Sequence, residues 1–244
     1  SLDGVSATAF WLHRNLLGGA ERLRIEGEVS GIEGGTLGLA GGGTDYALAA
    51  SFARPATFGP DTDLTLAARI ERQDEEDYAL DQLTFDIGLT RYATDDLTLT
   101  AALGLLTARE ETAAGTRDYT LLTLPLGAAW DRRDDPRDPR AGFYVDADAM
   151  PFLTVAGDGG NGARLYADGR AYRGLGERFT LAGRLQLGSV LGADPLETPA
   201  DFLFFSGGGG TVRGQPYQSL GLPGIVRGVE VRTGGASFVG LQTE

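Results

Sequence analysis

The residues best suited to chemistry lie in one glycine-rich stretch, 207-GGGGTVRGQPYQSLG-221, where a single arginine follows four glycines. A glycine-rich loop can cradle phosphate, but a P-loop requires Gly-Lys-Ser/Thr, and here Gln215 and Pro216 follow Gly214. The dinucleotide-binding spacing fails as well. The stretch therefore predicts a flexible, glycine-rich backbone next to one fixed positive charge, Arg213.

Residues for acid–base or zinc chemistry are scarce. His13 is the only histidine and the chain has no cysteine, which argues against a zinc site. The same count removes the usual Ser-His-Asp arrangement, unless His13 is the base. We interpret His13 as a solvated or interfacial residue at the end of a strand.

A second dense cluster of charges is 131-DRRDDPRDPRAG-142, with four Asp, four Arg and two Pro. Its spacing is not that of an EF-hand loop, and the interleaved arginines would neutralise a calcium site. We predict a tight turn braced by Arg–Asp pairs, with Pro136 and Pro139 fixing φ. We therefore expect no catalytic residue, no metal and no cofactor, and no enzyme activity.

Composition narrows the class of protein. The chain has 244 residues, a net charge of -13 and 38 glycines. An acidic chain is a poor candidate for sequence-independent nucleic-acid binding. The longest nearly uncharged run, residues 119–130, is too short for a membrane-spanning helix, which needs about 20 residues. Because the sequence begins and ends inside strand patterns and shows no signal peptide, we interpret it as an internal piece of a longer protein.

Apolar residues alternate with polar ones through most of the chain. The period of two is clear in residues 22–30, 97–105, 143–149 and 179–187, and a similar pattern covers 119–130; it predicts strands with one apolar and one polar face. Short links (15–21, 55–61, 92–96, 174–177) alternate with longer ones (31–45, 72–77, 109–117, 155–162, 193–236), which is typical of an up-and-down sheet.

The alternation fits a soluble β-sandwich as well as a membrane barrel. Three features favour the barrel: a polar face rich in charge, an apolar face nearly free of charge, and segments of about ten residues. We predict an all-β, transmembrane, antiparallel up-and-down β-barrel in which the polar face lines a wet lumen.

Three motifs together resemble one family. They are 10-FWLHRNLLGGAERLRIEGEVSG-31, 130-WDRRDDPRDPRAGFYV-145 and 204-FFSGGGGTVRGQPYQSLG-221. In this order they resemble the turn and loop motifs of the BamA/TamA superfamily of outer-membrane assembly and translocation barrels. The third motif is most similar to the TamA branch, which assembles autotransporters. The resemblance covers essentially the whole chain.

The resemblance implies a sixteen-stranded barrel preceded by periplasmic POTRA domains. Residues 1–244 would run from about the second strand to the start of the twelfth, without the POTRA domains, the first strand and the last strands. The turn at 131–142 would be periplasmic, and its motif residues would be Asp131, Arg133, Asp134, Pro136, Pro139 and Gly142.

In this family the sixth extracellular loop folds back into the lumen, and here it would be residues 193–236. The resemblance implies that Arg213 pairs with an acidic residue of the barrel wall, and the alternation in 238–244 makes Glu244 the candidate partner. The implied lock comprises Val212, Arg213, Gly214, Gln215, Tyr217 and Glu244, beside the glycine run Gly207, Gly208, Gly209 and Gly210. Gln215 stands where the motif usually has an aromatic residue, and Tyr217 is the candidate replacement.

The resemblance implies a protein of the bacterial outer membrane that contacts its lipid and promotes insertion or translocation of autotransporters and other β-barrel clients. A TamB-like inner-membrane partner would act through the POTRA domains. Three alternatives stay open: a two-partner-secretion pore of the same superfamily, an unrelated outer-membrane barrel such as a protease or lipase, and a soluble adhesin-like β protein.

Overall fold

The structure, a computed structural model, describes residues 5–32, 44–75, 78–112, 115–176, 178–195, 197–208, 210–212, 214–215, 220–226 and 229–244. At residues 5, 32, 224–226 and 229–232 it describes the backbone only. Most of these residues lie in strands. No helix among them has the length and apolarity needed to cross a membrane.

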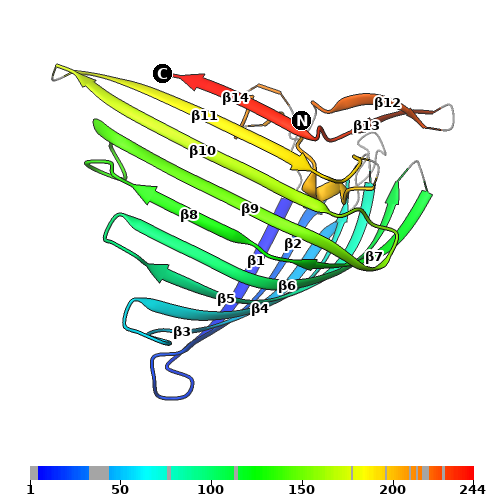
Figure 1. Cartoon of the computed structure of the whole chain (residues 1–244), viewed down its shortest axis with the longest axis horizontal. Coiled ribbons are helices and arrows are strands. Elements are labelled where there is room, and N and C mark those ends of the chain that lie inside the picture. The colour runs from blue at the N-terminus through cyan, green and yellow to red at the C-terminus, as the bar shows by residue number, and fades with distance from the viewer. Residues whose placement is uncertain are drawn as a thin grey trace.

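The strands follow one another along the chain with one short 3-10 helix, η1 (Ala200–Phe202) (Figure 1). Their bounds are β1 (Val5–Arg14), β2 (Arg22–Ile32), β3 (Asp45–Arg54), β4 (Thr62–Asp74), β5 (Tyr78–Tyr92), β6 (Leu97–Thr112), β7 (Gly115–Thr123), β8 (Leu126–Asp131), β9 (Ala141–Gly157), β10 (Gly162–Leu175), β11 (Phe179–Leu191), β12 (Leu222–Val226), β13 (Val229–Thr233) and β14 (Ser237–Thr243).

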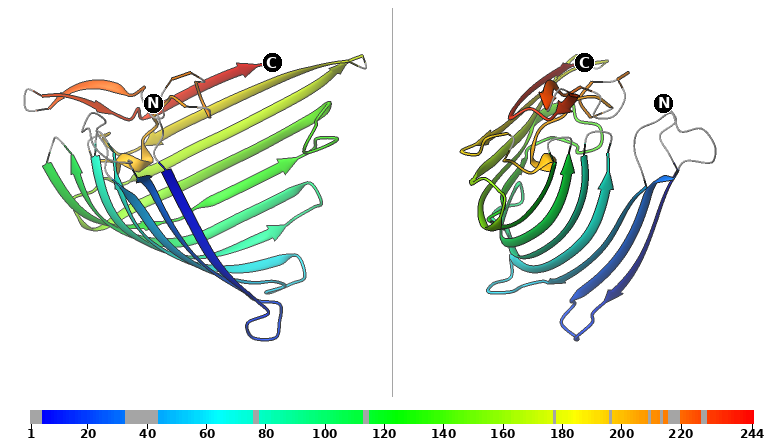
Figure 2. Two further views of the ribbon diagram at one scale, coloured as in Figure 1. Left: turned by 180° about the vertical axis from the view of Figure 1, so that it is seen from behind. Right: turned by 90° about the vertical axis from the view of Figure 1, so that its right-hand side faces the viewer.

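Twelve of the described strands form one antiparallel sheet in which almost every strand pairs with its neighbour in sequence. The order runs from β1 to β11, and β14 then pairs with β11 across the intervening chain. β12 and β13 pair only with each other, as a separate hairpin. The sheet curls into an open trough with β1 and β14 at its two edges (Figure 2).

One predicted strand is interrupted. The pattern over 119–130 predicts a continuous strand, but the structure divides it into β7 and β8, which both pair with β6 and β9. The break falls at Leu124 and Pro125, because proline has no N–H to donate to a neighbouring strand. The carbonyl of Pro125 still accepts a hydrogen bond from the Ala102 amide at 2.8 Å.

The two rims of the trough differ. The turn rim carries the connections 15–21, 55–61, 93–96, 132–140 and 176–178, and the loop rim carries the connections that follow β2, β4, β6, β9 and β11. Two links of the loop rim are shorter than predicted, since β4 continues to Asp74 and β6 continues to Thr112. Charged residues there extend the strand patterns instead of ending them.

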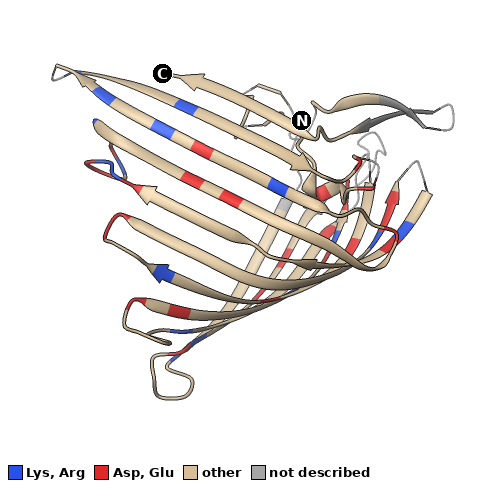
Figure 3. Cartoon of the chain, in the orientation of Figure 1, with Lys and Arg blue, Asp and Glu red and all other residues tan. Residues whose placement is uncertain are grey.

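The convex face is apolar and exposed, whereas the concave face is largely polar, apart from a buried apolar cluster that includes Leu80, Leu106 and Leu121. On β5, Leu83, Phe85 and Ile87 are exposed on the convex face, while Gln82 and Asp86 point to the other side. Charged residues also occur in the middle of strands, most visibly on β9, β10 and β11 (Figure 3). Apolar outside and polar inside is the arrangement of a membrane barrel, so the concave face is named the lumen wall below.

Candidate functional site

The candidate site lies in the chain between β11 and β14, whose first part, at the described residues 197–208 and 210–212, folds back against the lumen wall. This segment, residues 192–236, is named the re-entrant loop, with a base at 194–206 and a tip at 207–215. η1 of the base lies within the curve of the sheet (Figure 2, right). The two arms of the loop pair with each other at Phe204 and Gly235 and again at Ser206 and Leu220.

A buried glutamate of β6 holds the base. Glu110 is only 1% exposed, and its Oε2 accepts hydrogen bonds from the Ala200 amide at 2.9 Å and from the Tyr119 hydroxyl at 3.2 Å. Its Oε1 is paired with Arg117. Arg117 also donates to the Thr198 carbonyl at 3.1 Å, so the same ion pair contacts two points of the base.

An aromatic stack holds the end of the base. The Phe204 ring lies between Tyr166 and Phe238, with ring centroids 6.3 and 6.2 Å away and nearly parallel planes. Gly188 provides the room, because a Cβ there would be 2.6 Å from the Phe204 ring. The Arg164 guanidinium lies 4.7 Å from the centre of the same ring, at cation–π distance.

Arg164 also links this stack to η1. Its Nε donates to the Phe202 carbonyl at 3.1 Å. The Phe202 ring meets Phe152 of β9 edge to face, with centroids 5.3 Å apart. The base therefore contacts β6, β7, β9, β10 and β14 through side chains that all point into the lumen.

The tip meets a different part of the wall. Arg184 of β11 donates to the Gly210 carbonyl at 3.0 Å, and Gln242 of β14 donates to the Thr211 carbonyl at 2.8 Å. Asp168 of β10, 6% exposed, orients Arg184 through an ion pair of 2.7 Å and also pairs with Arg170 at 2.8 Å.

The glycine run makes the turn at the tip. Gly207 and Gly208 have φ of 114° and 86°, and Gly214 has φ of 89°, which side chains rarely adopt. The Thr211 hydroxyl accepts a hydrogen bond from the Gly207 amide at 2.8 Å. Gly210 is exposed and has open space where a Cβ would stand.

The predicted lock is described only in part. Arg213, Tyr217 and Gly209 lie outside the described residues, so their pairing stays a prediction. Val212, Gly214 and Gln215 are exposed. Glu244 is exposed just after β14, and its backbone pairs with Ala182 at 2.9 Å in both directions.

The alternation around Glu244 follows the predicted parity. Phe238 and Gln242 contact the re-entrant loop, and Gly240 lies on the same side. Val239 and Leu241 are strongly exposed on the convex face. Glu244 follows Gln242 by two residues.

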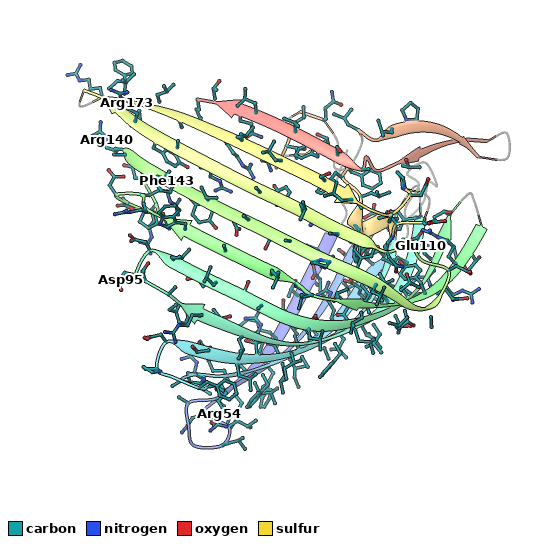
Figure 4. All side chains as sticks on the ribbon, viewed as in Figure 1. Arg54, Asp95, Glu110, Arg140, Phe143 and Arg173 are labelled. Carbon is teal, nitrogen blue, oxygen red and sulfur yellow. The ribbon has the colours of Figure 1, made fainter. Side chains whose placement is uncertain are left out.

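The charged turn 132–140 lies at the turn rim, far from the re-entrant loop, as Arg140 and Glu110 show in Figure 4. Arg133 forms two short hydrogen bonds with Asp131, at 2.8 and 2.7 Å, and donates to the Pro136 carbonyl at 3.2 Å. The turn is thus braced by an Arg–Asp pair within the motif.

Asp134 closes the same turn. Its Oδ1 accepts hydrogen bonds from the amides of Arg140 at 2.9 Å and Ala141 at 3.0 Å. These amides, Ala141 first, hold the pKa of Asp134 below its ordinary value. Gly142 has φ of 98°, and a Cβ there would lie 2.0 Å from the Arg132 carbonyl oxygen, so the position requires glycine. Pro139 lies in the turn between Asp134 and Gly142.

His13 is exposed on β1, with its ring 5.8 Å from that of Trp11. Among the residues that the structure describes, no group of three or more His, Cys, Asp or Glu could hold a metal ion. The described side chains of the site therefore offer hydrogen bonds, ion pairs and aromatic contacts.

The residues that hold the base were not predicted as site residues from the sequence. Glu110, Arg117 and Tyr119 fall in or beside the segment interpreted as a link. The odd-numbered leucines of 97–105 lie on the apolar face. If the period of two is extended past residue 105, Leu106, Ala108 and Glu110 fall on the opposite face of a longer strand.

Comparisons with known proteins identify a family and a similar fold. Residues 15–244 match the Omp85 superfamily domain. None of the curated proteins compared with the sequence matches it. The crystal structure of BamA from Haemophilus ducreyi lacking POTRA domains 1-3 is similar, with a TM-score of 0.82 and 15% sequence identity.

That similarity covers 100% of this chain and 50% of the BamA chain, so the chain spans about half the length of that structure. At this identity the match shows the fold, and it confirms the predicted barrel-type sheet. The family match covers nearly all of the sequence and confirms the predicted superfamily. The chain belongs to the Omp85 superfamily of outer-membrane β-barrel proteins.

Proposed function

We propose that this chain forms the barrel part of an outer-membrane assembly factor that promotes insertion or translocation of β-barrel clients. One observation carries the proposal: a glycine-rich loop is fastened inside a BamA-like sheet whose convex face is apolar. A loop packed on the lumen wall occupies space that an open pore would leave to water.

The proposed mechanism is physical and needs no covalent catalysis. An apolar convex face inserts in the lipid, and client strands pair with a strand edge of the barrel by β-augmentation. The re-entrant loop stabilises the wall from inside, since it joins strands that are far apart in the sheet. No cofactor enters this mechanism.

The finer assignment rests on the sequence motifs. The form FFSGGGGTVRG followed by YQSLG favours the TamA branch, and autotransporters are therefore the proposed clients. A TamB-like partner that binds POTRA domains, and the pairing of Arg213 with Glu244, belong to the same proposal.

The experiment uses the full protein that carries this chain, reconstituted in liposomes. Unfolded autotransporter barrels and unrelated outer-membrane barrels are added, and folding is followed by heat-modifiable gel mobility and protection from protease. We expect faster insertion of autotransporter barrels than in empty liposomes. Secretion of one dedicated soluble client without faster barrel insertion would support a two-partner-secretion pore instead. No acceleration of any client would contradict the proposal.

A further inference from the structure

We propose that Glu110 is a positioning residue that fastens the base of the re-entrant loop to the lumen wall, independently of the glycine-rich tip. The loop is then held at two separable points, of which only the tip belongs to the Val-Arg-Gly motif. The anchor itself goes beyond the proposed function, and only its effect on client assembly depends on that function.

The chemistry of the Glu110 contacts requires a carboxylate. Both of its oxygens face donors: Arg117 on one side, and the Tyr119 hydroxyl and the Ala200 amide on the other. An amide side chain of the same shape has only one acceptor oxygen. Whichever way a glutamine lies at this position, its N–H group points at another donor.

The position of Glu110 makes its contacts with the loop costly to lose. Glu110 and Thr198 are each only 1% exposed, and the two are bridged through Arg117. A hydrogen bond to a charged group that is shielded from water is among the stronger ones in proteins. The base also pairs with the β9–β10 connection, where the Gly160 amide donates to the Glu197 carbonyl at 3.0 Å.

The contacts of the tip use other residues on other strands. Gly210 and Thr211 are held by Arg184 and Gln242, which belong to β11 and β14. Glu110 belongs to β6 and contacts β7 and the base. None of the side chains named here contacts both the base and the tip. The structure therefore predicts that the base can detach from the wall while the tip stays bound, and that the tip can detach while the base stays bound.

The adjacent residue on β6 provides a matched control. Glu111 is exposed on the opposite face of the sheet and pairs with exposed Arg109 at 3.4 Å. Changing Glu111 to Gln removes the same charge one position away without touching the loop. Any difference between the two variants therefore reports the contacts of Glu110.

The test measures how often Thr198 becomes accessible. The 244 residues contain no cysteine, so a Thr198→Cys variant of the full protein, with any other cysteines removed, carries one thiol at a buried position of the base. Its reaction with a small maleimide is followed in liposomes for Glu110→Gln and Glu111→Gln in this background. Heat-modifiable gel mobility shows that each barrel is folded.

We expect labelling of Glu110→Gln to be at least about tenfold faster than in the parent, as loss of charge-assisted hydrogen bonds implies. Glu111→Gln should label like the parent. Proteinase K cleavage of the tip, mapped by mass spectrometry, should be the same in all three. Equal labelling of Glu110→Gln and Glu111→Gln would overturn the anchor, and a freed tip in Glu110→Gln would overturn its independence.

If Glu110→Gln does not fold, the Glu110→Asp variant tests whether Glu110 anchors the base. It keeps the charge but withdraws the carboxylate from the Ala200 amide by one methylene, so labelling should rise several-fold; unchanged labelling would overturn the anchor. Client insertion is measured in parallel. Fast labelling with normal insertion leaves the anchor standing and counts against a role of the loop in the proposed function.

Discussion

The base and the tip of the re-entrant loop both touch the lumen wall, but different contacts hold them. The base inserts backbone groups and aromatic rings among buried side chains, with Glu110 and Thr198 almost completely shielded. The tip is exposed at Gly210 and Val212, and the wall reaches it through hydrogen bonds to carbonyl groups. Because of this difference, we expect the base to stay bound to the wall under conditions in which the tip detaches.

The largest effect is expected where the tip depends on a buried charge. Asp168→Asn removes the carboxylate that orients Arg184, and we expect a loss of about 2 kcal/mol in tip docking, below the value for a fully buried pair because Arg184 is partly exposed. Proteinase K should cleave the tip faster, while Thr198→Cys labelling should not change.

The control for this prediction is Asp81→Asn, which breaks the exposed Arg72–Asp81 pair of similar length, 2.9 Å. An exposed pair contributes at most about 1 kcal/mol, so the tip should stay as resistant as in the parent. Faster cleavage in both variants would show that lost charge, and not the position of Arg184, loosens the tip.

A smaller effect is expected from filling the space below Phe204. Gly188→Ala places a methyl group 2.6 Å from the ring, and the cost of overpacking should lie at the lower end of about 1–3 kcal/mol because Phe204 is only partly buried. The base should label faster at Thr198→Cys. Gly183→Ala on the same strand meets nothing within 4 Å and should have no effect; if both alanines behave alike, Phe204 does not depend on Gly188.

The base should also respond to pH through Asp201. Burial raises the pKa of Asp201 from 3.8 to about 7, and the nearby carboxylates of Glu110 and Glu71 add to the rise. Its Oδ1 is shielded from solvent and has no hydrogen-bond donor among the described residues. Gln82 of β5, Tyr119 of β7 and Arg164 of β10 also face Asp201.

Docking therefore favours the protonated carboxyl of Asp201. The stabilisation of the docked base by this protonated carboxyl is complete below pH 3.8. It is lost as the pH rises through about 7. Between pH 6 and pH 8, we expect Thr198→Cys labelling to rise by up to roughly tenfold, beyond the change of an unfolded cysteine peptide. Asp201→Asn should remove this dependence, and a dependence that persists in Asp201→Asn would assign it to another group.

The smallest effect is expected from Tyr119→Phe. It removes one hydrogen bond to Glu110 and leaves Arg117 and the Ala200 amide in place. The net loss of about 0.5–1.5 kcal/mol should raise Thr198→Cys labelling a few-fold. Tyr92→Phe, at an exposed tyrosine of β5, provides the control. An increase as large as that of Glu110→Gln would mean that the tyrosine, and not the carboxylate, carries the anchor.

Much of the fold could be predicted from the sequence, because a period of two has a direct geometric meaning in a strand. It placed Leu185 and Leu187 on one face and Arg184 and Gln186 on the other, as observed. The break at Pro125 was predictable in principle from the missing N–H, but the alternation continued across it.

The site was harder to predict. Glu110 and Ala200 are separated by 90 residues and meet only because the sheet curves and the loop folds back. Periodicity gives the face of each residue but not the depth at which a distant loop docks. The motif indicated Arg213 in the tip, whereas the buried contacts of the base carry no comparable sequence signature.

The most direct test of the two-point account is a double-mutant comparison in the Thr198→Cys background. Labelling is measured for Glu110→Gln, Asp168→Asn and the combination, with tip cleavage recorded for each. If base and tip are held independently, base labelling in the combination should equal that of Glu110→Gln within about 0.5 kcal/mol, since independent sites add. If Asp168→Asn alone exposes Thr198 as much as Glu110→Gln does, base and tip open together, which contradicts independent anchoring at two points.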